Sequence, residues 1–128
     1  MIVGRRSHTD WQCLSFQSGV GSRFRARVAN WVGKRQYPHG RYLIRLGLYR
    51  EAVKAFEAAE KWYRESYGPL HPYVAAALIR QGWCNAKLGR IEDACRAYDR
   101  ALEIIEATEG SAHPMAREIR AYLTSTCG

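Results

Sequence analysis

Apolar residues recur at helical spacing along two long stretches of the chain, residues 49–66 and residues 91–108. In each stretch they fall three or four positions apart, so one side of a helix would be apolar and the other polar. The apolar positions are Tyr49, Ala52, Val53, Phe56, Ala59 and Tyr63 in the first stretch, and Ile91, Ala94, Cys95, Tyr98, Ala101, Leu102 and Ile105 in the second. The pattern predicts two amphipathic helices, and the alanines indicate that another helix crosses close to each of them.

The two stretches belong to two copies of one repeat, offset by 42 residues. The first copy begins at Leu46 with LGLYREAVKAFEAAEKWYRESYGPLHP, and the second begins at Leu88 with LGRIEDACRAYDRALEIIEATEGSAHP. Eight positions are identical, including two glycines, three alanines and a His-Pro pair. A period of about 20 to 50 residues is typical of a solenoid, in which each unit buries its apolar face against its neighbours. We therefore predict an all-α solenoid.

The links GPLHP and GSAHP each predict the end of one helix and the start of the next. Gly68 and Gly110 can end a helix, and proline suits the first helical turn because its missing donor is not needed there. A helix is therefore expected after each link, and the second should end near Cys127. Their apolar positions are Val74, Ala75, Leu78 and Gly82 in the first helix, and Met115, Ile119 and Leu123 in the second.

The N-terminal part has a different character. Residues 1–21 show no clear period, which predicts an irregular or mobile segment. Residues 22–39 begin with a basic amphipathic pattern that Ser22 is suited to cap, and its apolar face would include Trp31. A break is expected at YPHG, because Pro38 lacks a donor and Gly40 loosens the backbone. The repeat domain would then occupy residues 40–128, with its first leading helix shortened to residues 40–46.

Residues 22–39 admit several interpretations. They could be the leading helix of a degenerate first repeat, or a cap on the repeats. Residues 1–35 are also rich in arginine and serine and poor in acids, which is the composition of an organelle transit segment. A surface that binds nucleic acid or anionic lipid is a third interpretation, and a poorly ordered tail is a fourth.

Length and composition favour one soluble domain inside the cell. The chain has 128 residues, of which 47% are apolar, and it has no apolar run of the length that spans a membrane. No apolar run follows the N-terminal arginines, so a secretory signal is not expected and a cytoplasmic location is predicted.

The positive charge is concentrated at the N-terminal end. The net charge is +8, yet residues 1–50 alone hold ten Lys or Arg against one acid. Attraction to an anionic partner would therefore arise from this part of the chain. The basic patch in question consists of Arg23, Arg25, Arg27, Lys34 and Arg35.

Neither the cysteines nor the histidines indicate a chemical site. The four cysteines have no close pairing, so neither a zinc site nor a disulfide framework is predicted, and a reducing compartment follows. Cys95 stands where the other copy has Val53, which predicts a small buried apolar side chain. His71 and His113 occupy equivalent links, which indicates a structural role. With no catalytic motif present, we predict no enzyme activity, no cofactor and no metal.

The repeat resembles the tetratricopeptide repeat. The stretch GWCNAKLGRIEDACRAYDRAL has its small residues at Gly82, Ala94 and Ala101 and large ones at Ile91 and Tyr98. The 42-residue period with G-x-x-H-P links is similar to the long-helix type of kinesin light chains. The resemblance implies a short right-handed superhelix of antiparallel helix pairs, whose leading helices line a concave groove that holds a peptide or a partner helix.

Carried over by position, this groove consists of ten residues. They are Arg41, Ile44, Arg45, Ala76, Ile79, Arg80, Trp83, Lys87, Glu118 and Ala121. Ile79 and Arg80 replace the paired Asn of kinesin light chains, so hydrogen bonding of those Asn to a peptide backbone is not carried over. The basic residues favour an acidic ligand instead. Trp83 is either an aromatic anchor for the partner or a cover on an adjacent helix.

Two clear units are fewer than the three or so that repeat arrays usually need. Both ends of the stack would then expose apolar surface. This predicts a longer array, self-association, or capping by residues 1–36.

Overall fold

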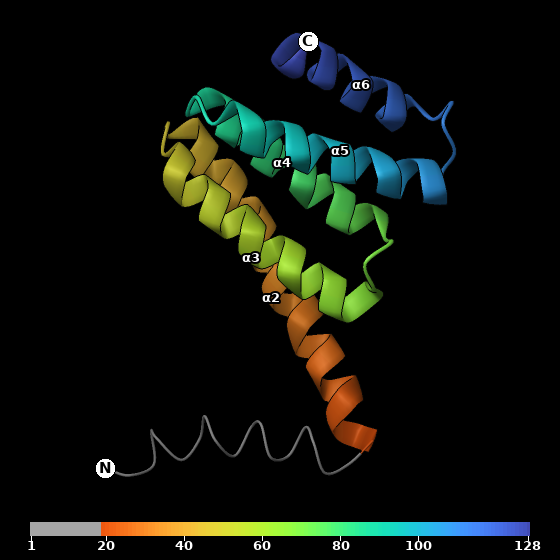
Figure 1. Cartoon of the computed structure of the whole chain (residues 1–128). Coiled ribbons are helices and arrows are strands. Elements are labelled where there is room, and N and C mark those ends of the chain that lie inside the picture. Colours follow the sequence, from red (N-terminus) through yellow and green to blue (C-terminus); the bar gives the residue numbers. More distant parts are fainter. Residues whose placement is uncertain (1–18) are drawn as a thin grey trace.

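The computed structural model describes residues 19–128. These residues form five helices and contain no strand (Figure 1). The helices are α2 (Gly19–Arg45), α3 (Tyr49–Tyr67), α4 (Pro72–Lys87), α5 (Ile91–Thr108) and α6 (Pro114–Cys127). Each packs against its neighbours in sequence, so α2 and α3 form one antiparallel pair, α4 and α5 form the next, and α6 follows without a trailing helix.

The helices repeat in register. The starts of α3 and α5, at residues 49 and 91, are 42 residues apart, and so are those of α4 and α6, at residues 72 and 114. This confirms the all-α solenoid and its period. Below, α2, α4 and α6 are called leading helices, and α3 and α5 trailing helices.

The repeated His-Pro pairs begin the leading helices, as their equivalence indicated. The Nδ1 atom of His71 accepts a hydrogen bond from the backbone N–H of Tyr73 at 3.1 Å. His113 caps α6 in the same way, accepting from Met115 at 3.1 Å. Each imidazole thus satisfies a donor that the first helical turn leaves unpaired.

Close helix crossings explain two glycines inside the leading helices. A Cβ atom on Gly82 would lie 2.8 Å from the ring of Tyr98, and one on Gly40 would lie 2.7 Å from the ring of Phe56. Both rings are fully buried. Gly40 was expected to loosen the backbone, yet it lies within α2 and allows α3 to approach. The predicted apolar faces of α3 to α6 supply most of the core between the helices.

The predicted break at residues 37–40 is wrong. α2 continues through Pro38, and it begins at Gly19, so Ser22 lies inside the helix rather than capping it. Pro38 is exposed, and so is Lys34, whose carbonyl the proline leaves without its helical partner; water can satisfy that group. The packing of Tyr37 and Leu43 against α3 outweighs the local preference of proline.

The structure tests the other expectations for the N-terminal part only where they concern residues 19 and beyond. Residues 19–21 belong to α2, whereas the rest of the predicted irregular segment, residues 1–18, lies outside the described residues. The transit segment proposed for residues 1–35 lies partly outside them too. Trp31 was expected on a buried face, but 58% of its surface is exposed. The domain boundary expected at residues 39–40 falls inside α2.

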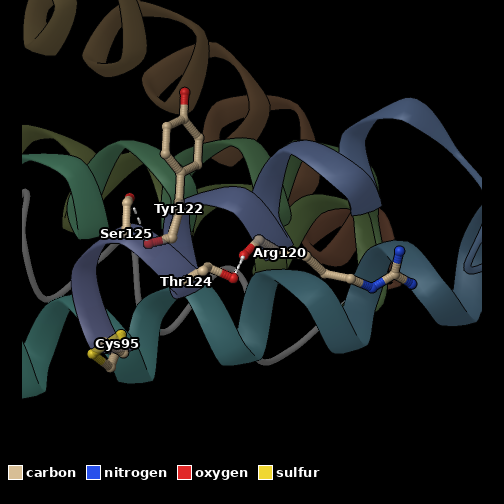
Figure 2. The surroundings of a disulfide bond; sticks show 6 residues. Cys95, Arg120, Tyr122, Thr124 and Ser125 are labelled. Carbon is tan, nitrogen blue, oxygen red and sulfur yellow. Dashed lines mark hydrogen bonds between the residues drawn. A yellow bond between two sulfur atoms is a disulfide. The ribbon is translucent and has the colours of Figure 1, made fainter.

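A disulfide joins the last two helices, contrary to the prediction from cysteine spacing. Cys95 in α5 pairs with Cys127 at the end of α6 (Figure 2). The two residues are 32 apart in sequence, but the antiparallel packing of α5 and α6 brings their Cα atoms to 6.1 Å. Cys95 is therefore a half-buried cross-link rather than a buried apolar residue. Such bonds persist in oxidising surroundings, so this pair does not support the predicted reducing compartment.

Within residues 19–128, no helix combines the length and the apolar character needed to cross a membrane.

Candidate partner-binding face

The side chain of Arg80 lies at the centre of the face that the three leading helices share. From α4, its Nε atom donates a hydrogen bond to the hydroxyl of Tyr37 in α2, at 3.2 Å. On its α6 side, the hydroxyl of Tyr122 donates to Oε1 of Glu118, at 2.9 Å. Burial would lower the pKa of Arg80, but the Tyr37 hydrogen bond and the nearby Tyr122 and Glu118 raise it overall. Arg80 therefore stays charged.

Aromatic stacking holds Tyr122 in place beside this arginine. Its ring stacks on that of Tyr98 in α5, with ring centroids 5.3 Å apart and planes 15° apart. Tyr98 in turn lies against Gly82 of α4. The hydrogen bond to Glu118, followed by burial, raises the pKa of Tyr122, so its hydroxyl remains a donor. Burial raises the pKa of Tyr98 to about 12.

Three further cations on the leading helices have no acidic partner within residues 19–128. Arg41, Arg45 and Lys87 are exposed, and among the described residues no carboxylate lies within ion-pair distance of them. Arg45 and Lys87 stand in the last turns of α2 and α4, where a positive charge complements the helix dipole. Nothing on the described chain neutralises these cations, so an anionic ligand could do so.

Trp83 covers an adjacent helix, one of the two roles considered for it. Its ring meets that of Tyr49 in α3 edge-on, with centroids 5.8 Å apart. The Nζ atom of Lys87 lies 5.0 Å from the centre of the Trp83 ring, within cation–π range. The indole is only half-buried, so part of it remains available to a ligand.

The ten predicted groove residues all lie on leading helices, but they differ in exposure. Arg41, Arg45, Lys87, Glu118 and Ala121 are exposed, whereas Ile44, Ala76, Ile79, Arg80 and Trp83 are half-buried. Ile44 and Ile79 pack against the core. The structure brings Arg80 and Glu118 into electrostatic range, and Trp83 and Lys87 into contact. It records no such contact between Arg41 or Arg45 and the residues of α4.

Sequence reasoning missed Tyr37 and Tyr122, the two tyrosines on either side of Arg80. The repeat offset could have found them, because Tyr37 lies one period before Ile79 and Tyr122 lies one period after Arg80. Ile79 and Arg80, the counterparts of these tyrosines on α4, were already assigned to the groove.

The basic patch lies on α2. The side chains of Arg27, Lys34 and Arg35 are exposed, and the guanidinium of Arg35 lies 4.8 Å from the centre of the Trp31 ring. Arg23 and Arg25 lie on the same helix, but their side chains are outside the described part.

Other reactive groups form no site in the described part of the chain. No cluster of three or more His, Cys, Asp or Glu side chains could hold a metal ion there. Cys84 is a free thiol, but burial raises its pKa to about 11, which keeps it protonated. Such a thiol is a poor nucleophile.

A family comparison agrees with this architecture. Residues 36–107, more than half of the chain, match the model of the tetratricopeptide repeat. The chain belongs to the tetratricopeptide repeat family. Tetratricopeptide repeats are scaffolds without catalytic function that generally mediate protein–protein interaction. None of the curated proteins matches the chain.

The tetratricopeptide repeat match also clarifies the role of α2. The match begins at Gln36, before the expected domain start at Gly40, and so includes Pro38. The last turns of α2 pack on α3 through Tyr37 and Leu43. This part of α2 therefore lies within the region that matches the tetratricopeptide repeat.

Proposed function

We propose that this chain is a non-catalytic interaction module that binds an acidic peptide segment or partner helix on its leading-helix face. We further propose that it is of the kinesin-light-chain-like type, on the basis of its 42-residue period and its G-x-x-H-P links. The observation that carries the proposal is the charge of that face. Arg80 lies between two tyrosines, and Arg41, Arg45 and Lys87 lack acidic partners on the described chain.

The chemistry of Arg80 suits a carboxylate ligand. A guanidinium has five N–H donors, and among residues 19–128 only the Nε donor of Arg80 has a hydrogen-bond partner, the neutral hydroxyl of Tyr37. The remaining donors can form the paired hydrogen bonds by which arginine holds a carboxylate. Because Arg80 is half-buried, such a bond would be less exposed to solvent than one on the rim.

A set of labelled peptides of equal length and rising Glu content would test the proposal by fluorescence anisotropy. We expect affinity to rise with Glu content, and Arg80→Glu to raise Kd about tenfold to a hundredfold, because a charged hydrogen bond contributes about 1.5–3 kcal/mol. Trp83→Ala should weaken binding as well.

Arg90→Glu is the matched control, because Arg90 is an exposed residue of the turn between α4 and α5. It should leave the dependence on Glu content in place. Peptides that bind equally well to the wild-type protein and to the Arg80→Glu and Trp83→Ala variants would contradict the proposal.

The charge of α2 favours a second candidate function, binding of nucleic acid or an anionic surface. α2 contains seven basic residues and no acidic residue. Binding to phosphates would weaken steeply between low and physiological salt, and the combined Arg23→Glu and Arg27→Glu changes should abolish it. Binding that survives these changes and depends on Arg80 would favour the leading-helix face instead.

A further inference from the structure

The outer side of α2 exposes a stripe of apolar and basic residues. We call it the end stripe, and its members are Trp31, Arg35, His39, Tyr42 and Leu46. Successive members are four, four, three and four residues apart, so the four that belong to α2 lie on one side of the helix. Leu46 lies just beyond the end of α2. Trp31, Tyr42 and Leu46 are 58%, 57% and 54% exposed. Two large aromatic side chains on one side of α2, and Leu46 just beyond its end, thus lie in solvent.

For Tyr42 and Leu46, the repeat shows what covers the equivalent positions one period later. Tyr42 corresponds to Cys84, which is fully buried in a cluster formed with α2 and α3. Leu46 corresponds to Leu88, which packs against that cluster. In the second repeat, these positions are therefore covered by the preceding helix pair.

His39 corresponds to Gln81, whose contacts identify the covering helix. The Nε2 atom of Gln81 donates to the backbone carbonyl of Phe56 at 3.2 Å, and it lies 3.5 Å from Oε1 of Glu60. Both partners belong to α3, the trailing helix of the first repeat. The end stripe is thus the position at which a trailing helix of a preceding unit would lie.

A shallow open hollow between α2 and α3 lies beside the end stripe. Its lining residues are Gln36, His39, Leu43, Glu51, Lys54 and Ala55. The basic residues of the hollow are His39 on α2 and Lys54 on α3, and its one acidic residue is Glu51. In the second repeat, the counterpart of His39 is Gln81, and α3 contacts that residue.

A second copy that pairs through its own end stripe is disfavoured by charge. α2 has seven basic residues and no acidic one, so two such helices side by side would repel each other. The occupant must supply carboxylates as well as an apolar side.

We propose that the end stripe is a docking site for an acidic amphipathic helix of another protein. This helix would lie antiparallel to α2, as α3 lies beside α4, with its apolar side on Trp31, Tyr42 and Leu46. A carboxylate in the place that Glu60 takes in α3 would lie beside His39, and others would meet Arg35 and Lys54. The site is separate from the leading-helix face and does not depend on the function proposed for it.

A peptide of residues 49–67 is a suitable probe, because α3 fills the equivalent position on α4. With Lys54→Glu, Lys61→Glu and Arg64→Glu it becomes strongly acidic, and the unchanged peptide, which has equal numbers of acids and bases, is its control. We expect the full chain to bind the acidic peptide at least about tenfold more tightly at low salt, because only that peptide complements α2.

Variants of the protein then locate the site. Tyr42→Asp and Trp31→Asp should each weaken binding of the acidic peptide at least about tenfold, since they place a negative charge on the end stripe. Leu70→Asp is the matched control, because Leu70 is 62% exposed on the link between α3 and α4. Leu70→Asp should leave Kd unchanged. The loss caused by Tyr42→Asp should persist in an Arg80→Glu background, in which binding of the acidic peptide to the leading-helix face is removed.

Three results would overturn the proposal. The first is that the acidic peptide does not bind. The second is that its binding is lost with Arg80→Glu and kept with Tyr42→Asp, which would assign the binding to the leading-helix face. Sedimentation equilibrium that shows a dimer dissociated by Tyr42→Asp would identify the occupant as a second copy. If no peptide binds to the leading-helix face but the acidic peptide binds to the end stripe, the function proposed above is contradicted and the docking site proposed here is supported.

Discussion

Single residues decide how closely the helices of this protein approach. The rings of Phe56 and Tyr98 take equivalent places in the two trailing helices, and each lies over a glycine of the leading helix before it. The glycines are at Gly40 and Gly82, again one period apart. A side chain at either position would have to displace a fully buried ring.

We expect Gly82→Ala to destabilise the fold by about 1–3 kcal/mol, as overpacking of a core does. Its Cβ would lie 2.8 Å from the Tyr98 ring, and stacking on Tyr122 restrains that ring from moving away. In an open helix the same change would stabilise by up to about 1 kcal/mol. Urea denaturation followed by circular dichroism measures the difference.

The control for Gly82→Ala is the same change in a Tyr98→Leu background. Without the ring, the methyl group has room, and the helix preference of alanine should prevail. A loss of stability that is equally large in both backgrounds would show that the ring is not its cause.

At the scale of helices, α6 depends on its neighbour and on a covalent bond. Only Ala116 and Ile119 of α6 are fully buried, and within residues 19–128 no helix follows α6 as α5 follows α4. The disulfide holds its last turn to Cys95 of α5 (Figure 2). Loss of this bond should affect the end of α6 first, because few apolar contacts hold it there.

We expect removal of the disulfide by Cys95→Ser with Cys127→Ser to cost up to about 4 kcal/mol, from the loop entropy of a 32-residue separation. A reducing agent should lower Tm of the wild-type protein. In hydrogen exchange, protection should fall most in the last turns of α6.

The double serine variant is also the control for the reducing agent, since its Tm should not respond to it. A wild-type protein whose Tm is unchanged on full reduction would contradict a stabilising role for this bond.

For the molecule as a whole, the contact between the two repeats is the critical interface. Glu60 of α3 is 8% exposed, and its carboxylate meets Arg64 of its own helix at 2.6 Å. It also lies 3.5 Å from Gln81 of α4 and 3.7 Å from Arg100 of α5. One buried carboxylate therefore joins the first repeat to both helices of the second.

We expect Glu60→Ala to destabilise the protein by about 1–3 kcal/mol, because Gln81 loses a buried partner and the two arginines lose their counter-ion. Repeat proteins owe their cooperativity to contacts between neighbouring units, so the unfolding transition should also broaden. Calorimetry measures both effects.

Glu57→Ala is the control for Glu60→Ala, since Glu57 lies on α3 but is exposed. An unfolding transition of unchanged midpoint and width in Glu60→Ala would rule out this carboxylate as a link between the repeats.

The sequence by itself determined helices α3 to α6 and their order in the repeats. The start of α3, the starts of α4 and α6 at their prolines, and the caps by His71 and His113 all follow from patterns within one period. Such features depend on residues a few positions apart, which the sequence displays directly. The roles proposed for the leading-helix residues remain predictions, because they depend on a partner and not on the fold alone.

Only the tertiary structure decided the features that depend on distant contacts. α2 continues through Pro38 because α3 packs against it, and Cys95 meets Cys127 because α5 and α6 run antiparallel. The exposure of Tyr42, in a place where the next repeat buries Cys84, likewise depends on which helix lies alongside. The periodicity of a chain shows which side of a helix is apolar, but only the arrangement of its neighbours shows whether that side is covered.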